Sequence, residues 1–209
     1  MRALVLVLVI SIFSLNVGYT QNDVEAKKVL DAVSTKVKSF SAITGNFVIK
    51  TITSKGKLNG TKSGTISMKG SKYVLKQGKT QIICDGNNTY SYDGSKTITV
   101  AAADDADKTL TPQKIIAGSY SKDFTYKLVS SKGNFNEIEL KPIDKRKNFQ
   151  KVNVFVDKVK SMITKAKVLD KSNNTLEFSF TNLNTNAKLA DKIFVFNKAN
   201  YPKDVEVLD

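Results

Sequence analysis

The sequence lacks histidine and nearly lacks cysteine, which removes most catalytic and metal-binding chemistry. It contains 0 His and 1 Cys, at position 84. Without histidine, the usual general base near neutral pH and the commonest nitrogen ligand for metals are both missing. A single thiol can form neither an intramolecular disulfide nor a thiolate zinc site. Because Cys84 ends an apolar strand, we interpret it as a buried structural thiol. We therefore expect no enzyme, no cofactor and no metal site.

An enzyme built on carboxylates or lysine is the alternative that composition leaves open. The acidic residues that stand out are Asp85, Asp93, Asp104 and Asp105, and turn or loop positions explain them better than catalysis does.

Arginine is almost absent although the formal net charge is +14. The lysines are scattered through turns and polar strand faces, without aromatic-flanked basic runs, so nucleic-acid binding is a poor interpretation. A solvated lysine-rich surface is the simplest explanation. The functional alternative is attraction to anionic membranes or an acidic partner, which salt would weaken.

The N-terminus predicts export. Arg2 precedes the apolar run "ALVLVLVISIFSL" at 3–15, and small or polar residues follow at "NVGYTQND". We interpret 1–20 as a signal peptide cleaved near 18–22 and 21–209 as one domain. An uncleaved anchor is the alternative, although spanning a bilayer takes about 20 apolar residues. No cysteine follows the run to accept lipid, so an exported, soluble protein is expected.

The remaining sequence predicts many strands and two helices. Apolar residues recur at helical spacing from Asn22 or Asp23 to Phe40. Thr111 followed by Pro112 begins a short second helix that ends near Gly118. Alternation with period two predicts strands elsewhere. They cover 43–53, 64–70, 72–78, 80–85, three short strands within 82–100, and then 124–130, 136–144, 149–157, 161–170, 174–182 and 191–197.

Such a succession predicts a mainly β fold with helices. Short Gly-bearing turns favour consecutive antiparallel hairpins. A sheet with one apolar face must close on itself, form a sandwich, or curl around a helical plug. We expect a curved antiparallel sheet of about eleven strands forming an incomplete (half) β-barrel. The N-terminal helix and a short helical lid would cover it, and a partly unfilled interior would take apolar ligands.

The order of motifs resembles the LolA family of periplasmic outer-membrane lipoprotein carriers. The resemblance begins at "VKSFSAITGNFVIK", with Phe40 and Gly45–Phe47, and continues through "GTISMKGSKYVLK" and "IICDGNNTYSYD". It then includes Thr111-Pro112, "IELKP" and "KIFVFN…DVEV". Their order and spacing, rather than any one motif, carry the likeness.

This resemblance implies a carrier that binds lipoprotein acyl chains in an apolar cavity. It would receive lipoproteins from an inner-membrane ABC exporter, deliver them to an outer-membrane acceptor, and act as a monomer. One departure concerns the lid. Known members carry an Arg-Pro pair after the strand matching "GTISMK", and that arginine ties the lid closed; here Gly70-Ser71 stands in its place. The tryptophans common in bacterial carriers are also absent, with Tyr90 and Tyr92 in their place.

Strand alternation supplies the candidate lipid-binding residues, with ordinary core packing as the simpler explanation of each. On the strands they are Phe47, Ile49, Ile66, Met68, Tyr73, Leu75, Tyr90, Tyr92, Ile98 and Phe178, and on the lid Ile115, Ile116 and Tyr120. A register error of one residue would reverse a whole strand. The competing functions are an envelope sensor or interaction module of the same fold and a carrier of another apolar ligand.

Overall fold

The computed structural model describes residues 23–103, 110–118, 120 and 122–209, and within them the chain forms one 12-stranded sheet. Its helices are α1 (Val24–Lys38) and α2 (Pro112–Ala117), with 3-10 turns η2 (Asp191–Phe194) and η3 (Lys198–Asn200). The strands are β1 (Ile43–Ile52), β2 (Leu58–Lys69), β3 (Lys72–Gln77), β4 (Thr80–Cys84), β5 (Asn88–Tyr92), β6 (Thr97–Ala102), β7 (Phe124–Ser130), β8 (Phe135–Pro142), β9 (Phe149–Asp157), β10 (Met162–Asp170), β11 (Thr175–Asn184) and β12 (Glu206–Leu208).

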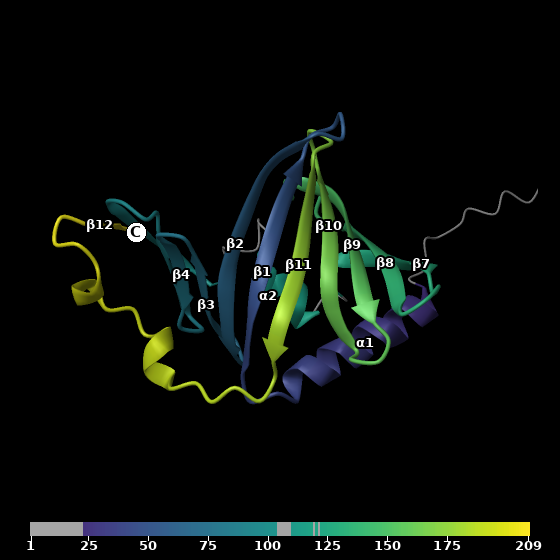
Figure 1. Ribbon diagram of the computed structural model, residues 1–209, viewed down its shortest axis with the longest axis horizontal. Helices are drawn as coiled ribbons and strands as arrows, with labels where there is room; N and C mark the ends of the chain where they lie inside the picture. Colours follow the sequence, from purple (N-terminus) through teal and green to yellow (C-terminus); the bar gives the residue numbers. More distant parts are fainter. Residues whose placement is uncertain (1–22, 104–109, 119, 121) are drawn as a thin grey trace, which may run out of the picture.

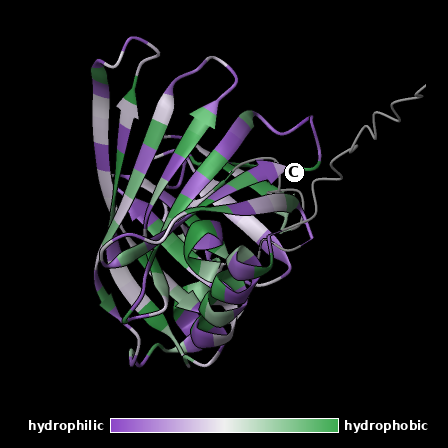
Figure 2. Cartoon of the chain, turned by 90° about the vertical axis from the view of Figure 1, so that its right-hand side faces the viewer, coloured by the Kyte–Doolittle hydropathy of each residue, from purple (hydrophilic) through white to green (hydrophobic). Residues whose placement is uncertain are grey.

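The sheet consists of two runs of hairpins that are joined where β1 pairs with β11. The strand order is β12-β6-β5-β4-β3-β2-β1-β11-β10-β9-β8-β7, so β1 pairs with β11 in the middle and β12 and β7 lie at the edges. Neighbours are antiparallel except β12, which runs parallel to β6. The sheet curves without closing, and α1 and α2 lie inside the curve (Figures 1 and 2). The predicted curved, helix-covered sheet is confirmed, with one strand more than expected.

The predicted strand at 191–197 is wrong. These residues form η2 and then an extended stretch outside the sheet, and the last strand is β12 instead. The error has a physical source, because Phe194 is buried while Ile193 and Val195 are exposed. That alternation imitates a strand, but it arises from packing of the C-terminal segment (residues 185–209) against the sheet beside β3 and β4 (Figure 1).

Apolar side chains are buried on both faces of the sheet, in two separate cores. The larger core fills the concave face and includes α1, α2 and strands from β1 to β4 and β7 to β11. The smaller core lies on the opposite face, where Val74 and Ile83 pack with Phe194. Strands β3 and β4 thus bury side chains on both sides, with Tyr73 and Cys84 facing the helices.

Asp23 fastens the start of α1 to the edge strand β7. One carboxylate oxygen accepts hydrogen bonds from the backbone N–H groups of Glu25 (2.9 Å) and Ala26 (3.2 Å), which caps the helix. The other oxygen accepts from Leu128 N at 3.0 Å, and the Asp23 amide donates to Tyr126 O at 3.2 Å. These donors, with Leu128 the largest contributor, lower the pKa of Asp23. One residue therefore sets both the beginning of α1 and its position inside the sheet.

Candidate functional site

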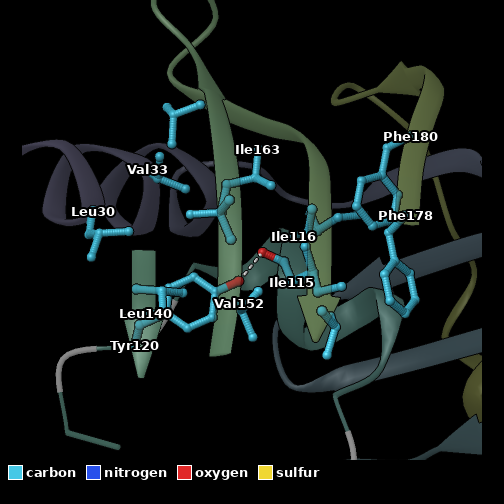
Figure 3. Close-up of a cluster of buried hydrophobic side chains, with 14 of the residues drawn as sticks. Leu30, Val33, Ile115, Ile116, Tyr120, Leu140, Val152, Ile163, Phe178 and Phe180 are labelled. Atoms are coloured by element: carbon cyan, nitrogen blue, oxygen red, sulfur yellow. Dashed lines mark hydrogen bonds between the residues drawn. The ribbon is translucent and has the colours of Figure 1, made fainter. Parts of the chain in front are cut away.

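The short helix α2 occupies the concave face, with Ile115 and Ile116 buried (Figure 3). Its first turn is set by Thr111, whose hydroxyl oxygen accepts from Lys114 N at 3.3 Å, with Pro112 at the first helical position. Its end is set by Gly118, which has a left-handed backbone with φ of 66°. A Cβ atom at Gly118 would lie 2.6 Å from Val33 Cγ1, so only glycine allows α2 to end this close to α1.

Tyr120 fastens the end of α2 from within the core. Its hydroxyl donates to the carbonyl oxygen of Ile115 at 2.8 Å (Figure 3). Its ring meets Phe124 edge-on, with 5.6 Å between centroids, and Phe124 stacks on Phe149 at 6.1 Å. Burial raises the pKa of Tyr120, so the hydroxyl remains a proton donor at any physiological pH. We call α2 together with Tyr120 the lid.

Two cavities flank the lid. The seam cavity, of about 310 Å³, lies between β3 and β4 on one side and the beginnings of β7 and β9 on the other. Its aromatic walls are Tyr73, Tyr120, Phe124 and Phe149, and Lys114, Asp123 and Lys147 are among its polar lining. The α1 cavity, of about 390 Å³, lies between the end of α1, the end of β2 and the lid. Both cavities are lined by Ser71, Gln113 and Ala117, so the lid separates two parts of one apolar concavity.

Burial keeps two ionisable side chains of the seam cavity, those of Tyr73 and Cys84, uncharged. Desolvation raises the pKa of Tyr73 to about 12 and also raises the pKa of Cys84. The Cys84 thiol donates to Ser71 O at 3.7 Å, which agrees with its interpretation as a structural thiol. This part of the wall therefore suits an apolar group, while the charged side chains Lys114, Asp123 and Lys147 also line the cavity.

Ten of the thirteen residues proposed for the lining lie in the core around the lid, and three do not. Ile49 packs against this core and the other nine are part of it. They are Phe47, Ile49, Ile66, Met68, Tyr73, Leu75, Phe178, Ile115, Ile116 and Tyr120. Of these, Tyr73 and Tyr120 line the seam cavity and Met68 lines the α1 cavity.

The placement of Tyr90, Tyr92 and Ile98 is corrected, because they lie on the opposite face. Tyr90 stacks on Phe196 with 4.5 Å between ring centroids, and Tyr92 meets Tyr201 edge-on at 5.0 Å. Ile98 pairs directly with Tyr92 across β5 and β6, so it lies on the same face. Register explains the reversal: Cys84 pairs with Thr89, so Thr89 and Ser91 face the helices. The alternation within β5 and β6 was predicted correctly, but the apolar side of these strands is covered by the C-terminal segment.

Sequence reasoning missed Phe124, Phe149, Gln113 and Ala117, which all line the seam cavity. Phe124 begins a predicted strand in phase with the buried Tyr126, so alternation could have identified it. Phe149 is out of phase with the buried residues that follow it in β9, because the β9–β10 register shifts near the start of β9, so alternation gives no signal for it. Gln113 and Ala117 line the cavity because of the orientation of α2, which strand alternation does not specify.

The position that would hold the arginine latch is a tight turn. Gly70 has φ of 59° in the β2–β3 turn, and Ser71 lines both cavities. The neighbouring Lys69 ammonium pairs with Asp191 at 2.9 Å on the C-terminal segment. The cation beside this turn therefore ties down that segment, and Tyr120 fastens the lid.

The prominent aspartates within the described residues are turn residues. Asp85 accepts from the N–H groups of Asn87 and Asn88, both at 2.8 Å. Asp93 accepts from three successive amides of the β5–β6 turn. Asp104 and Asp105 lie outside the described residues. Over the described part of the chain, no group of His, Cys, Asp or Glu side chains could hold a metal ion.

The expected signal peptide also lies outside the described residues. Among the helices that are described, none is both long and apolar enough to cross a membrane.

Comparison with known proteins identifies a family and several similar structures. The family model described as "Outer membrane lipoprotein carrier protein LolA" matches residues 38–197. An uncharacterised conserved protein of Thermus thermophilus has a similar structure, with TM-score 0.58 and 9% identity over 88% of this chain and 98% of that one. A LolA superfamily protein of Nitrosomonas europaea gives TM-score 0.49 and 16% identity, covering 82% of this chain and 97% of that one. LprF of Mycobacterium bovis gives 0.42 and 8%, covering 81% and 97%.

The structural likenesses, at such low identity, concern the fold alone. No curated protein sequence matches the chain. The family model, however, matches well over half of the sequence, so the chain belongs to the LolA family of outer-membrane lipoprotein carrier proteins.

Proposed function

We propose that the protein carries lipoprotein acyl chains across the periplasm, from the inner to the outer membrane, as an exported monomer of one domain spanning 21–209. An inner-membrane ABC exporter and an outer-membrane acceptor would be its partners. Its task is binding and release, without catalysis or cofactor. The observation that carries the proposal is the lid, a helix of 6 residues that fills an apolar concavity between two cavities.

The energetics favour exchange of the lid for an acyl chain. Moving the lid exposes the buried side chains of Ile115, Ile116 and Tyr120, at about 1.5–3 kcal/mol each, or about 4.5–9 kcal/mol together. Each buried methylene of a ligand returns about 0.8 kcal/mol. A chain that buries roughly eleven methylenes therefore offsets the opening, and a multiply acylated cargo exceeds it. Because the lid returns when cargo leaves, the same exchange supports release.

The decisive experiment fills the concavity. Ala117 lines both cavities, so Ala117→Trp should occupy the space between them and stabilise the closed lid. Ala102→Trp, on an exposed position of β6, is the matched control. The mature protein and both variants are isolated from an envelope that makes lipoproteins, and bound lipid and acylated protein are identified by mass spectrometry.

We expect acylated lipoprotein on the wild type and on the control, and much less on Ala117→Trp. Recovery of a different apolar ligand, lost in the same variant, would establish a carrier of another cargo. A folded wild type that is empty and fails to extract lipoproteins from membranes would overturn the carrier function and favour the sensor or interaction module.

A further inference from the structure

A groove distinct from the lid cavities lies beside the C-terminal half of α1. Its volume is about 780 Å³, and it runs between α1 and the neighbouring ends of β8 to β11. Apolar side chains form much of its wall, including Phe40, Phe135, Phe180 and Leu183. Lys36, Asp157, Val159 and Lys160 also line it. Phe180 belongs to the main core, so a core side chain forms part of the wall of this groove.

At the rim of the groove, the β9–β10 turn presents Val159 to solvent between two lysines. Val159 is 92% exposed, the most exposed of the large hydrophobic residues described. The turn itself is well ordered by hydrogen bonds. The Asp157 carboxylate accepts from Val159 N at 3.0 Å and Lys160 N at 2.9 Å. Val159 is therefore displayed by a defined turn, with the one carboxylate of that turn directed into its own backbone.

The β7–β8 turn lies beside the β9–β10 turn and is hydrogen-bonded to it. The Lys158 ammonium donates to Ser131 O at 2.7 Å, and its amide donates to Asn134 O at 3.0 Å. These bonds hold the β7–β8 turn, with exposed Lys132, against the β9–β10 turn. Phe135, at the beginning of β8, is 41% exposed.

Positive charge surrounds these apolar groups. Two lysines, Lys36 and Lys160, line the groove, and Asp157 is the acidic residue in the same lining. Lys158 and Lys132 extend the cationic rim along the two turns. The Lys36 ammonium lies 5.5 Å from the centre of the Phe40 ring, which shows that a lysine here keeps its stem on apolar surface.

We propose that this end of the protein, which we call the basic tip (Lys132, Phe135, Lys158, Val159, Lys160 and Lys36), docks on an anionic phospholipid bilayer. Val159 and Phe135 would enter the boundary between head groups and acyl chains, where an apolar side chain gains by leaving water. The lysines would lie at the level of the phosphates, with their stems toward the acyl region. A protein partner would not need an isolated aliphatic side chain raised between two cations. The proposal does not depend on acyl-chain carriage.

Vesicle binding tests the basic tip without any lipoprotein present. Binding of the mature protein is measured by co-sedimentation with vesicles of phosphatidylglycerol and phosphatidylcholine, and with phosphatidylcholine alone. We expect binding to the anionic vesicles that weakens as salt is raised. Each lysine near an anionic surface contributes about fivefold in affinity, so Lys132→Gln with Lys160→Gln, which leaves the Lys158 hydrogen bonds in place, should weaken binding roughly 25-fold. Val159→Ser should weaken it about tenfold.

The matched control removes the same charge at the opposite ends of the strands. Lys79 and Lys96 are exposed in the β3–β4 and β5–β6 turns, and Lys79→Gln with Lys96→Gln should change binding less than about threefold. Because the chain contains 0 Trp, Val159→Trp adds a single tryptophan, whose emission can be excited apart from that of the tyrosines. Its emission should shift to the blue on anionic vesicles, while the emission of Val195→Trp, at an exposed position away from the basic tip, should not shift.

Either of two results overturns the proposal. One is an absence of binding to anionic vesicles at low salt, and the other is binding that the control lysines weaken as much as the lysines of the basic tip. Absence of binding to anionic vesicles would favour an acidic protein as the partner that the lysines of the basic tip attract.

Discussion

Replacing Tyr120 with phenylalanine removes one hydroxyl from the core and tests what keeps the lid closed. That hydroxyl donates to Ile115 O at 2.8 Å, and both residues are buried. Leaving a buried carbonyl without its donor costs about 1–3 kcal/mol, and we take about 1.4 kcal/mol because the helix end can relax. This corresponds to a tenfold rise in the population of the open lid.

Hydrogen exchange measures this population directly. The Ile115 amide donates to Thr111 O at 3.1 Å within α2, so its exchange reports opening of the lid. We expect α2 amides to exchange about tenfold faster in Tyr120→Phe, while amides of β1 change much less. If an acyl probe binds only the open form, its apparent affinity should rise by the same factor.

Tyr92→Phe is the matched control, since its hydroxyl also donates to a backbone carbonyl, that of Ser95 at 3.0 Å, but outside the lid. Unchanged exchange in α2 of Tyr120→Phe, with the fold intact, would refute the role assigned to this hydrogen bond. Equal acceleration in α2 and β1 would mean that the lid opens only by global unfolding, which refutes it in a different way.

Three further substitutions probe the lid, the helix cap and the second core. Gly118→Ala should lower the free energy of unfolding by about 1–3 kcal/mol, because φ there is 66° and the added methyl meets α1; an unchanged urea midpoint would contradict this. Asp23 has a lowered folded-state pKa, so its stabilisation is complete above the unfolded value of about 3.9 and is lost as pH falls through the folded value. In Asp23→Asn, this part of the acid dependence of the urea midpoint should disappear. Phe194→Ala should cost about 3–5 kcal/mol in thermal or urea unfolding, since Phe194 is 0% exposed, while Val195→Ala next to it, 59% exposed, should stay within about 0.5 kcal/mol.

Local patterns were sufficient for both helices, for the strands before residue 185 and for most of the concave face. Thr111 and Pro112 gave the start of α2 because capping and the fixed proline φ are local effects. Alternation in β1 and β2 placed Phe47 and Ile66 on the buried side because only one side of these strands is apolar.

The same reasoning failed where the apolar side of the sheet changes. Tyr90 and Ile98 alternate as clearly as Phe47, but period two does not tell which side meets the helices. The answer depends on the β4–β5 register and on residues 185–209, which are distant in sequence. The cavities were equally inaccessible, because they depend on how α2 lies against Val33 and Tyr120 rather than on any strand pattern.

The smaller core, on the face opposite the helices, also limits where the chain can be truncated. The family match ends at residue 197, before Tyr201, Val205 and β12. A fragment ended at that boundary would lose the ring that meets Tyr92, the buried Val205 side chain, and the strand that covers part of the β6 edge. Exposed apolar surface beside a free strand edge favours pairing between molecules. We expect such a fragment to self-associate even with its ligand cavities intact, so oligomers seen in shortened versions would reflect the cut rather than the native protein.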